Sequence, residues 1–245
     1  MLKLRICLLP AFLFFYCCTP PASKQQTEQK AAQKKDTVYT YKKPAKNGIG
    51  KVYKGREIAQ VMGFSGAGWL ERDTRNQEEN VQLAVKNLPV DKNSIVADIG
   101  AGTGFYTFRI SPNVSKVYAI ELQDEALDYL KLRGKELKQH NVEVVKGEEK
   151  APNLPNNSID LALLVDVYHE LEYPQEYLQA LYKALKPGGK IVMLEYKGED
   201  PEVPIKELHK TTVVQISKEL TANGFTYLED IAGLPMQHFL IYQKK

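Results

Sequence analysis

The sequence predicts an α/β fold in which helices cover both faces of a mostly parallel sheet. Apolar runs of strand length alternate with segments of helical periodicity along most of the chain, and this alternation is typical of parallel sheets. One run, Ile159–Val165, is nearly unbroken, as expected for a strand buried on both faces. Another, Ser94–Ile99, leads directly into a glycine-rich turn. We therefore expect a doubly wound α/β domain.

The individual elements follow from the spacing of apolar residues and from the turn residues between them. Helical periodicity is found in residues 78–88, which end before Pro89, in residues 124–139, and in residues 174–185, before a Lys-Pro-Gly-Gly turn. The Asn223-Gly224 pair is expected to close one more helix at residues 212–222. The strands are expected at residues 94–99, 116–120, 142–145, 159–165, 190–194, 225–231 and 238–243.

The composition limits the class of protein. The 245 residues suffice for one α/β domain with additional segments. A formal charge of +3 gives no nucleic-acid signal, so we expect no nucleic-acid partner. We expect a monomer. All three cysteines lie in the first 18 residues, so the folded part can hold neither a disulfide nor a cysteine-ligated metal.

The first 18 residues have the pattern of an export signal. Lys3 and Arg5 precede an apolar run, residues 6–16, that is too short to span a bilayer and is followed by Cys17 and Cys18. This segment resembles a bacterial lipoprotein signal peptide, which implies lipid on one of the two cysteines, with Cys18 favoured over Cys17, and a membrane-anchored protein facing the periplasm or the cell exterior. An ordinary secretory signal or an N-terminal anchor is the alternative.

The next segment, residues 19–49, is rich in Lys, Gln, Thr, Pro and Ala. This composition predicts a disordered linker, because it cannot bury enough apolar surface to offset its ordering entropy. Its lysines either lie against anionic lipid headgroups or are simply solvated. We expect a helical arm or lid at residues 50–90 and the main domain at residues 91–245.

The glycine turn within Val96–Phe105 is the strongest functional signal. Gly100, Gly102 and Gly104 follow Asp98 at single-residue spacing, and glycine lets a ligand approach the backbone closely. The spacing differs from the G-x-G-x-x-G fingerprint of dinucleotide-binding domains, which disfavours a nicotinamide dehydrogenase. It resembles motif I of the class I S-adenosylmethionine-dependent methyltransferases.

Further landmarks, in order, strengthen this resemblance. Glu121 ends the second strand, Gly147-Glu148-Glu149 follows the third, and residues 154–160 and 185–189 match the segments before the fourth and fifth. The resemblance implies S-adenosyl-L-methionine as cofactor and the strand order 3-2-1-4-5-7-6, with strand seven antiparallel. It implies that Glu121 holds the ribose hydroxyls. The cofactor-binding residues that we expect are Asp98, Gly100, Ala101, Gly102, Thr103, Gly104, Glu121, Leu122, Glu148 and Asp166.

Chemically active side chains follow the unbroken strand, in Asp166-Val-Tyr-His-Glu170. Ligands of open α/β sheets bind at the carboxyl ends of the strands. We expect Asp166 to orient the cofactor or substrate, Tyr168 to line the path of the methyl group and His169 to accept a proton. The alternative is that His169 and Glu170 merely cap the next helix and complement its dipole.

Other candidates lie in the same predicted rim. The histidines have no H-x-x-x-H spacing and the strand ends offer no obvious carboxylate trio, so no metal site is expected. The residues that we expect to contact the substrate are Trp69, Arg72, Glu170, Glu195, His209 and His238.

Residues 55–75 hold the only tryptophan and three arginines. They resemble a segment of a set of exported or lipoprotein-like bacterial methyltransferases. One hypothesis is a lid, in which Arg72 or Arg75 meets a substrate carboxylate or phosphate. The other is a packing arm whose arginines pair with nearby glutamates. The predicted function is methyl transfer to an unidentified small-molecule or protein acceptor; the alternative is a non-catalytic S-adenosyl-ligand-binding module tethered to a membrane.

Overall fold

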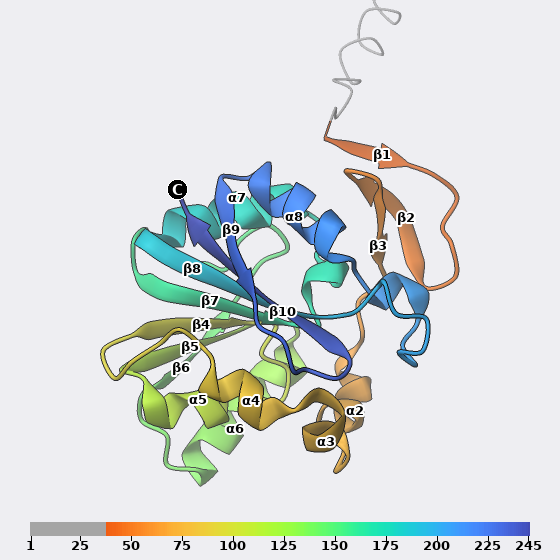
Figure 1. Ribbon diagram of the computed structural model, residues 1–245. Coiled ribbons are helices and arrows are strands. Elements are labelled where there is room, and N and C mark those ends of the chain that lie inside the picture. Colours follow the sequence, from red (N-terminus) through yellow and green to blue (C-terminus); the bar gives the residue numbers. More distant parts are fainter. Residues whose placement is uncertain (1–37) are drawn as a thin grey trace, which may run out of the picture. The chain divides into compact units, whose positions relative to one another are not determined.

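The computed structural model describes residues 38–245 (Figure 1). The predicted signal peptide, its Cys18 and most of the predicted linker lie outside these residues, so their predictions stay untested. None of the helices in residues 38–245 is both long enough and apolar enough to cross a membrane.

A seven-stranded sheet forms the centre of the domain, and its strand order is β6-β5-β4-β7-β8-β10-β9. In the order of the sheet's own strands this is 3-2-1-4-5-7-6, as predicted. The pairs from β6 through to β8 are parallel, whereas β10 is antiparallel to both of its neighbours. The strands are β4 (Ile95–Ile99), β5 (Lys116–Glu121), β6 (Val142–Lys146), β7 (Ile159–Val165), β8 (Leu185–Tyr196), β9 (Phe225–Asp230) and β10 (Gln237–Lys244).

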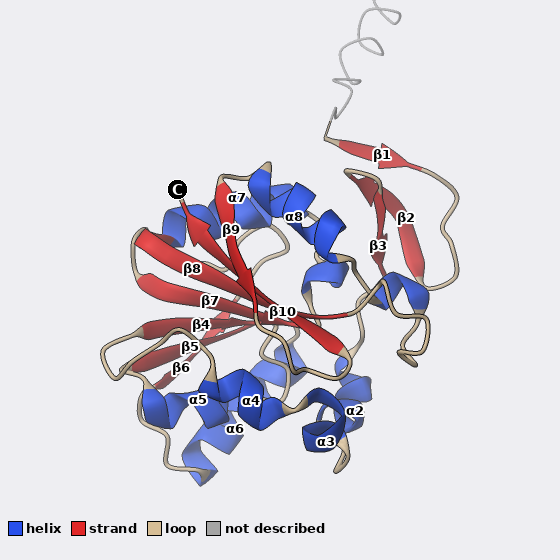
Figure 2. Ribbon diagram, viewed as in Figure 1, coloured by secondary structure: helices blue, strands red, loops and turns tan. Residues whose placement is uncertain are grey.

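Helices cover both faces of the sheet, as Figure 2 shows. On one face, α7 (Pro174–Ala184) and α8 (Val213–Thr221) bury apolar side chains such as Leu178 and Ile216 against the strands. On the other face lie α4 (Val81–Lys86), α5 (Thr107–Ile110) and α6 (Asp124–Glu136). The doubly wound α/β prediction is confirmed.

A second, three-stranded antiparallel sheet precedes the domain. It consists of β1 (Tyr39–Tyr41), β2 (Gly48–Tyr53) and β3 (Arg56–Ala59). The prediction of a disordered linker is therefore wrong from residue 39 onward, and the predicted helical arm begins with strands. The cause is tertiary: Arg56 of β3 binds Glu219 of α8 through two nitrogens, at 2.8 and 2.9 Å.

The rest of the arm is helical, in short pieces. Here η1 (Phe64–Gly66) and α2 (Ala67–Leu70) precede α3 (Arg75–Glu79) and α4. The continuous helix predicted over residues 78–88 is interrupted because Asn80 has a left-handed backbone, with φ of 50°. Three further single turns are η2 (Ser111–Asn113), η3 (Tyr168–Glu170) and η4 (Glu207–His209).

Candidate functional site

A cavity of about 700 Å³ opens at the carboxyl ends of the parallel strands. Its volume lies in the range of small-molecule pockets. The strand ends contribute Gly100, Glu121 and Asp166, and the arm contributes Met62 and Trp69. The arm thus forms part of the wall, as the lid and packing hypotheses both require.

The glycine turn has a backbone and surroundings that exclude larger residues. Gly100 and Gly102 have φ values of 65° and 54°, a region that L side chains rarely adopt. A Cβ on Gly100 would lie 2.5 Å from Cγ2 of Val167, and one on Gly102 would lie 2.8 Å from Cδ1 of Leu70. Both glycines line the cavity, so their backbone is open to a ligand there.

Glu121 joins the ends of β4 and β5. One carboxylate oxygen, Oε2, accepts the Gly102 amide at 3.0 Å. The other, Oε1, accepts the amides of Leu122 at 2.6 Å and Gln123 at 3.1 Å. Glu121, Leu122 and Glu148 all line the cavity, as the sequence predicts for cofactor contacts.

Asp166 follows β7 and carries an unusual buried carboxyl group. Its φ is +50°. Oδ2 accepts Nε2–H of Gln237 at 2.7 Å, whereas Oδ1 is buried and has no hydrogen-bond partner within the described part of the chain. Burial raises the pKa of Asp166 well above its ordinary value, and the charges of Glu79 and Glu195 raise it further. A cationic ligand group would therefore find a buried acceptor here.

The cavity wall beyond Asp166 holds two imidazole rings in contact. His169 Nε2 lies 3.1 Å from His209 Nδ1, and the other nitrogen of His169, Nδ1, lies 2.6 Å from Glu195 Oε2. A carboxylate only accepts, so Nδ1 of His169 carries the proton and the neutral ring keeps a lone pair on Nε2. Burial alone would lower the pKa of His169. The nearby carboxylates, first Glu195 and then Glu170 and Asp166, have the larger effect, so the net pKa is raised above its ordinary value.

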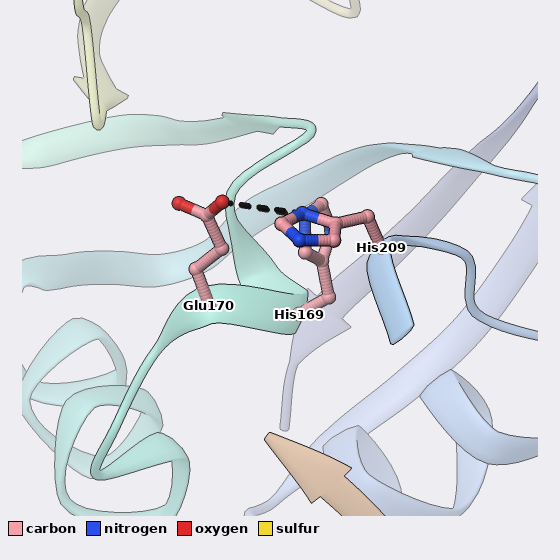
Figure 3. Close-up of side chains that lie close together, drawn as sticks. All are labelled: His169, Glu170 and His209. Carbon is pink, nitrogen blue, oxygen red and sulfur yellow. Dashed lines mark hydrogen bonds and ion pairs between the residues drawn. The ribbon is translucent and has the colours of Figure 1, made fainter. Parts of the chain in front are cut away.

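Glu170 completes this group (Figure 3). Its Oε1 lies 3.3 Å from His209 Nδ1 and 3.9 Å from His169 Nε2. The same oxygen accepts the backbone amide of Met62 from the arm at 3.1 Å. These three residues, His169, Glu170 and His209, are named the His-Glu-His cluster below.

The chain is similar to known methyltransferases. Residues 97–193 match the family model described as "Methyltransferase domain". A solved S-adenosylmethionine-dependent methyltransferase from Aquifex aeolicus superposes with a TM-score of 0.69 at 25% identity, over 75% of this chain and 98% of that one.

The chain carries a class I S-adenosylmethionine-dependent methyltransferase domain.

Two curated relatives show how far this similarity reaches. An uncharacterised methyltransferase-like protein of Schizosaccharomyces pombe is 32% identical over 47% of this chain and 43% of its own length. The ubiquinone/menaquinone biosynthesis C-methyltransferase of Escherichia fergusonii is 26% identical over 59% of this chain and 55% of its own length. The chain thus spans about half the length of the curated relatives that it matches.

The cofactor of this domain is S-adenosyl-L-methionine, and the residues present fit it. The positive-φ glycines keep one wall of the cavity free of side chains. Glu121 places a carboxylate beside that wall, and Asp166 Oδ1 is a buried acceptor that lacks a donor. A cationic, hydroxyl-rich ligand matches these acceptors.

Some of the residues predicted to bind the cofactor lie behind the cavity wall and do not line it. Ala101, Thr103 and Gly104 are buried, and a Cβ on Gly104 would overlap Phe108. Asp98 accepts the Thr107 hydroxyl at 2.5 Å. These residues shape the turn.

Three residues predicted to contact the substrate or the transferred methyl group do not line the cavity. Tyr168 is buried and donates its hydroxyl to Glu219 at 2.6 Å, so the prediction that it lines the methyl path is wrong. Glu195 is fully buried and accepts the Val167 and Tyr168 amides, so it supports His169 rather than contacting substrate. His238 pairs with Glu199 at 2.8 Å, outside the cavity wall.

The contacts of Arg72 agree with the packing hypothesis for the arm. Its guanidinium binds Glu78 and Glu79, each at 2.7 Å, and stacks on the Trp69 ring. With its donors engaged inside the arm, Arg72 loses support as a substrate-binding residue. Trp69 itself remains half-exposed and lines the cavity.

Sequence reasoning missed one residue that ties the arm to the domain. Gln123 Oε1 accepts the Phe64 amide at 2.8 Å, and its Nε2 donates to the Met62 carbonyl at 3.2 Å. An amide side chain can bind backbone in both directions, but no spacing in the sequence identifies this partner. The position directly after the Glu121-Leu122 pair is the one available signal.

Proposed function

We propose that this chain transfers a methyl group from S-adenosylmethionine to an acceptor that enters the same cavity. The observation that carries the proposal is that one cavity joins the glycine turn and Glu121 on one side to the His-Glu-His cluster on the other. A donor site and a proton-accepting group therefore share one cavity. Such juxtaposition supplies the positioning that transfer reactions need.

The chain's own residues would hold the donor by hydrogen bonds. Glu121 and the backbone of Gly102 form the wall beside the ribose-binding position, and Asp166 Oδ1 is free to accept from a cationic amino group. When bound, S-adenosylmethionine supplies an electrophilic methyl group on a positively charged sulfur. Trp69 and Met62 contribute apolar surface to the cavity wall.

The acceptor's proton would be taken by the His-Glu-His cluster. Because Glu195 fixes the Nδ1–H tautomer of His169, Nε2 carries the lone pair that a hydroxyl, thiol or amine proton requires. The relatives named after an acceptor differ widely, from a cobalt-precorrin-6B methyltransferase to a tRNA U34 carboxymethyltransferase. Their acceptors therefore give no guide to the acceptor of this chain.

The test is transfer of radioactive methyl from labelled S-adenosylmethionine to fractions of a cell extract by the full-length protein. We expect label in one fraction, and loss of transfer in Glu121→Gln. A matched control is Glu143→Gln, because Glu143 is an exposed strand residue that pairs with Lys116. If the wild type binds donor yet labels nothing, the chain is the non-catalytic binding module and the proposal is wrong.

We also propose that the protein is exported and lipid-anchored at Cys18. The support is the apolar run after Lys3 and Arg5 that ends at the cysteine pair. Metabolic labelling with a tagged fatty acid tests this. The wild type should be labelled and Cys18→Ala should not; equal labelling of both, or of neither, would contradict the anchor.

A further inference from the structure

We propose that the His-Glu-His cluster binds a divalent transition-metal ion at the cavity wall. The three atoms that face one another are His169 Nε2, His209 Nδ1 and Glu170 Oε1, and all lie within 4.8 Å of one another. Two imidazole nitrogens and one carboxylate oxygen form a recurrent ligand set of catalytic zinc sites. This differs from the sequence-based expectation of no metal site.

The spacing of the three atoms suits a common metal centre. Their separations are 3.1, 3.3 and 3.9 Å. Ligands bound at about 2.0–2.1 Å in a tetrahedron lie about 3.3 Å apart. Two of the three edges therefore need shifts of a few tenths of an ångström or less, and only the Glu170–His169 edge must shorten further. Rotation of the Glu170 side chain supplies that change.

The ring of His169 is already held as a metal ligand requires. Its Nδ1–H donates to the fully buried Glu195 carboxylate at 2.6 Å. In metal sites, a carboxylate on the distal nitrogen commonly fixes the ring orientation and tautomer of a ligating histidine. Glu195 is in turn fixed by the Val167 and Tyr168 amides. Burying the Glu195 carboxylate costs free energy. A histidine with only a structural role does not need a buried carboxylate as its partner.

Lone pairs in the cluster outnumber the protons available to bridge them. Glu170 Oε1 accepts the Met62 amide with one lone pair. Its second lone pair and the lone pair of His169 Nε2 are left with a single proton, on His209 Nδ1, to serve both. A cation at the centre of the three atoms satisfies all of them together. Without metal, a shared proton bridges the three residues of the cluster. With metal, the same three residues would act as its ligands.

A metal here narrows the acceptor class, and this step rests on the proposed methyl transfer. All three residues line the cavity, so the coordination positions that the protein leaves open face the space where the acceptor would enter. An acceptor with a hydroxyl or thiol can occupy such a position. The metal would then lower the pKa of that group, in place of the free imidazole.

The experiment is a titration of chelator-treated, full-length protein without a histidine tag with Co²⁺, followed by its visible absorption. We expect one equivalent to bind and Zn²⁺ to displace it. Glu170→Gln and His209→Ala should each weaken Co²⁺ binding at least about tenfold. His140→Ala, which alters an exposed histidine outside the cavity, is the matched control and should bind as the wild type does.

The near-isosteric Glu170→Gln keeps the test informative if His209→Ala does not fold. Binding of S-adenosylhomocysteine is measured on the same samples by thermal shift, so the donor site is scored separately. Absence of one-equivalent binding, or equal Co²⁺ affinity in wild type and Glu170→Gln, would overturn the metal site while leaving methyl transfer intact. If Co²⁺ binds but S-adenosylhomocysteine does not, the donor site and the proposed methyl transfer are wrong and the metal site stands.

Discussion

His169 Nε2 lies 3.1 Å from His209 Nδ1 although 40 positions separate the two residues in the chain. The fold causes this contact. His169 belongs to η3 directly after β7, and His209 belongs to η4 in the connection after β8. Because β7 and β8 are parallel neighbours, both turns emerge at the same edge of the sheet. The contact joins the site's predicted proton acceptor to a residue predicted only as a substrate contact.

Glu195→Gln should reverse the tautomer of His169. The variant keeps an oxygen for the Val167 and Tyr168 amides but turns an NH₂ group toward Nδ1, which must then accept. The proton moves to Nε2, whose lone pair is lost. Nitrogen-15 NMR at a pH where the ring is neutral should show the Nδ1–H form in the wild type and the Nε2–H form in the variant. The same tautomer in both would contradict the role of Glu195.

Asp166→Asn should weaken donor binding and leave the fold at least as stable. Asn is well tolerated at a φ of +50° and can still accept from Gln237. Loss of a hydrogen bond to a charged group costs about 1.5–3 kcal/mol, which is about 10- to 100-fold in affinity. Calorimetric titration with S-adenosylhomocysteine measures this, and urea unfolding measures stability. Unchanged affinity would remove Asp166 from the donor site.

Asp98→Asn should remove a pH dependence of stability. Burial is the main cause that raises the pKa of Asp98 to about 6. The folded protein therefore holds this proton more tightly than the unfolded chain, so the wild type should gain stability relative to the variant as pH falls from about 6 to about 4. The gain should be about 3 kcal/mol, from a shift of about two units.

Urea unfolding of both proteins at several pH values checks this sign. Asp91 is the contrasting control, because the Asn93 amide lowers the pKa of this exposed carboxyl group. Asp91→Asn should thus show a difference of opposite sign, since the hydrogen bond that the ionised Asp91 carboxylate accepts from the Asn93 amide weakens as pH falls. A constant difference between wild type and Asp98→Asn from pH 4 to 7 would show that the buried carboxyl does not titrate as described.

Gln123→Ala should loosen the arm locally at the cavity mouth. Its side chain makes hydrogen bonds to the backbone of Met62 and Phe64. Each is worth about 1 kcal/mol, so local opening should become roughly ten- to thirtyfold more frequent. Hydrogen exchange of residues 61–66 is the measurement. Gln82→Ala, in an exposed position on α4, should leave it unchanged, and equal protection in Gln123→Ala would argue against the tether.

The central sheet was predictable because its signals are local. The unbroken run in β7 and the glycine turn after β4 each identify a buried strand without knowledge of the rest of the chain. The three-stranded sheet was not predictable in this way. Its short strands are ordered by distant partners, as when Arg56 binds Glu219 through two nitrogens at 2.8 and 2.9 Å.

The candidate site also contains both predictable and unpredictable parts. Glu121 and Gly102 lie where the motif places them, since strand and turn are adjacent in the sequence. Tyr168 and His169 are consecutive, yet η3 turns one into the core and the other toward the cavity. That difference depends on the φ and ψ angles of a single turn, which no residue pattern specifies.

The most direct test of the account is calorimetric titration of the full-length wild-type protein with S-adenosylhomocysteine, with NAD as the comparison ligand. We predict one binding site for S-adenosylhomocysteine, weakened in Glu121→Gln and unaffected in Glu143→Gln, and no heat with NAD. At 100 times its dissociation constant the ligand should also stabilise the fold by about 2.7 kcal/mol. Absence of binding, or tighter binding of NAD, would contradict the assignment of the cavity to S-adenosylmethionine.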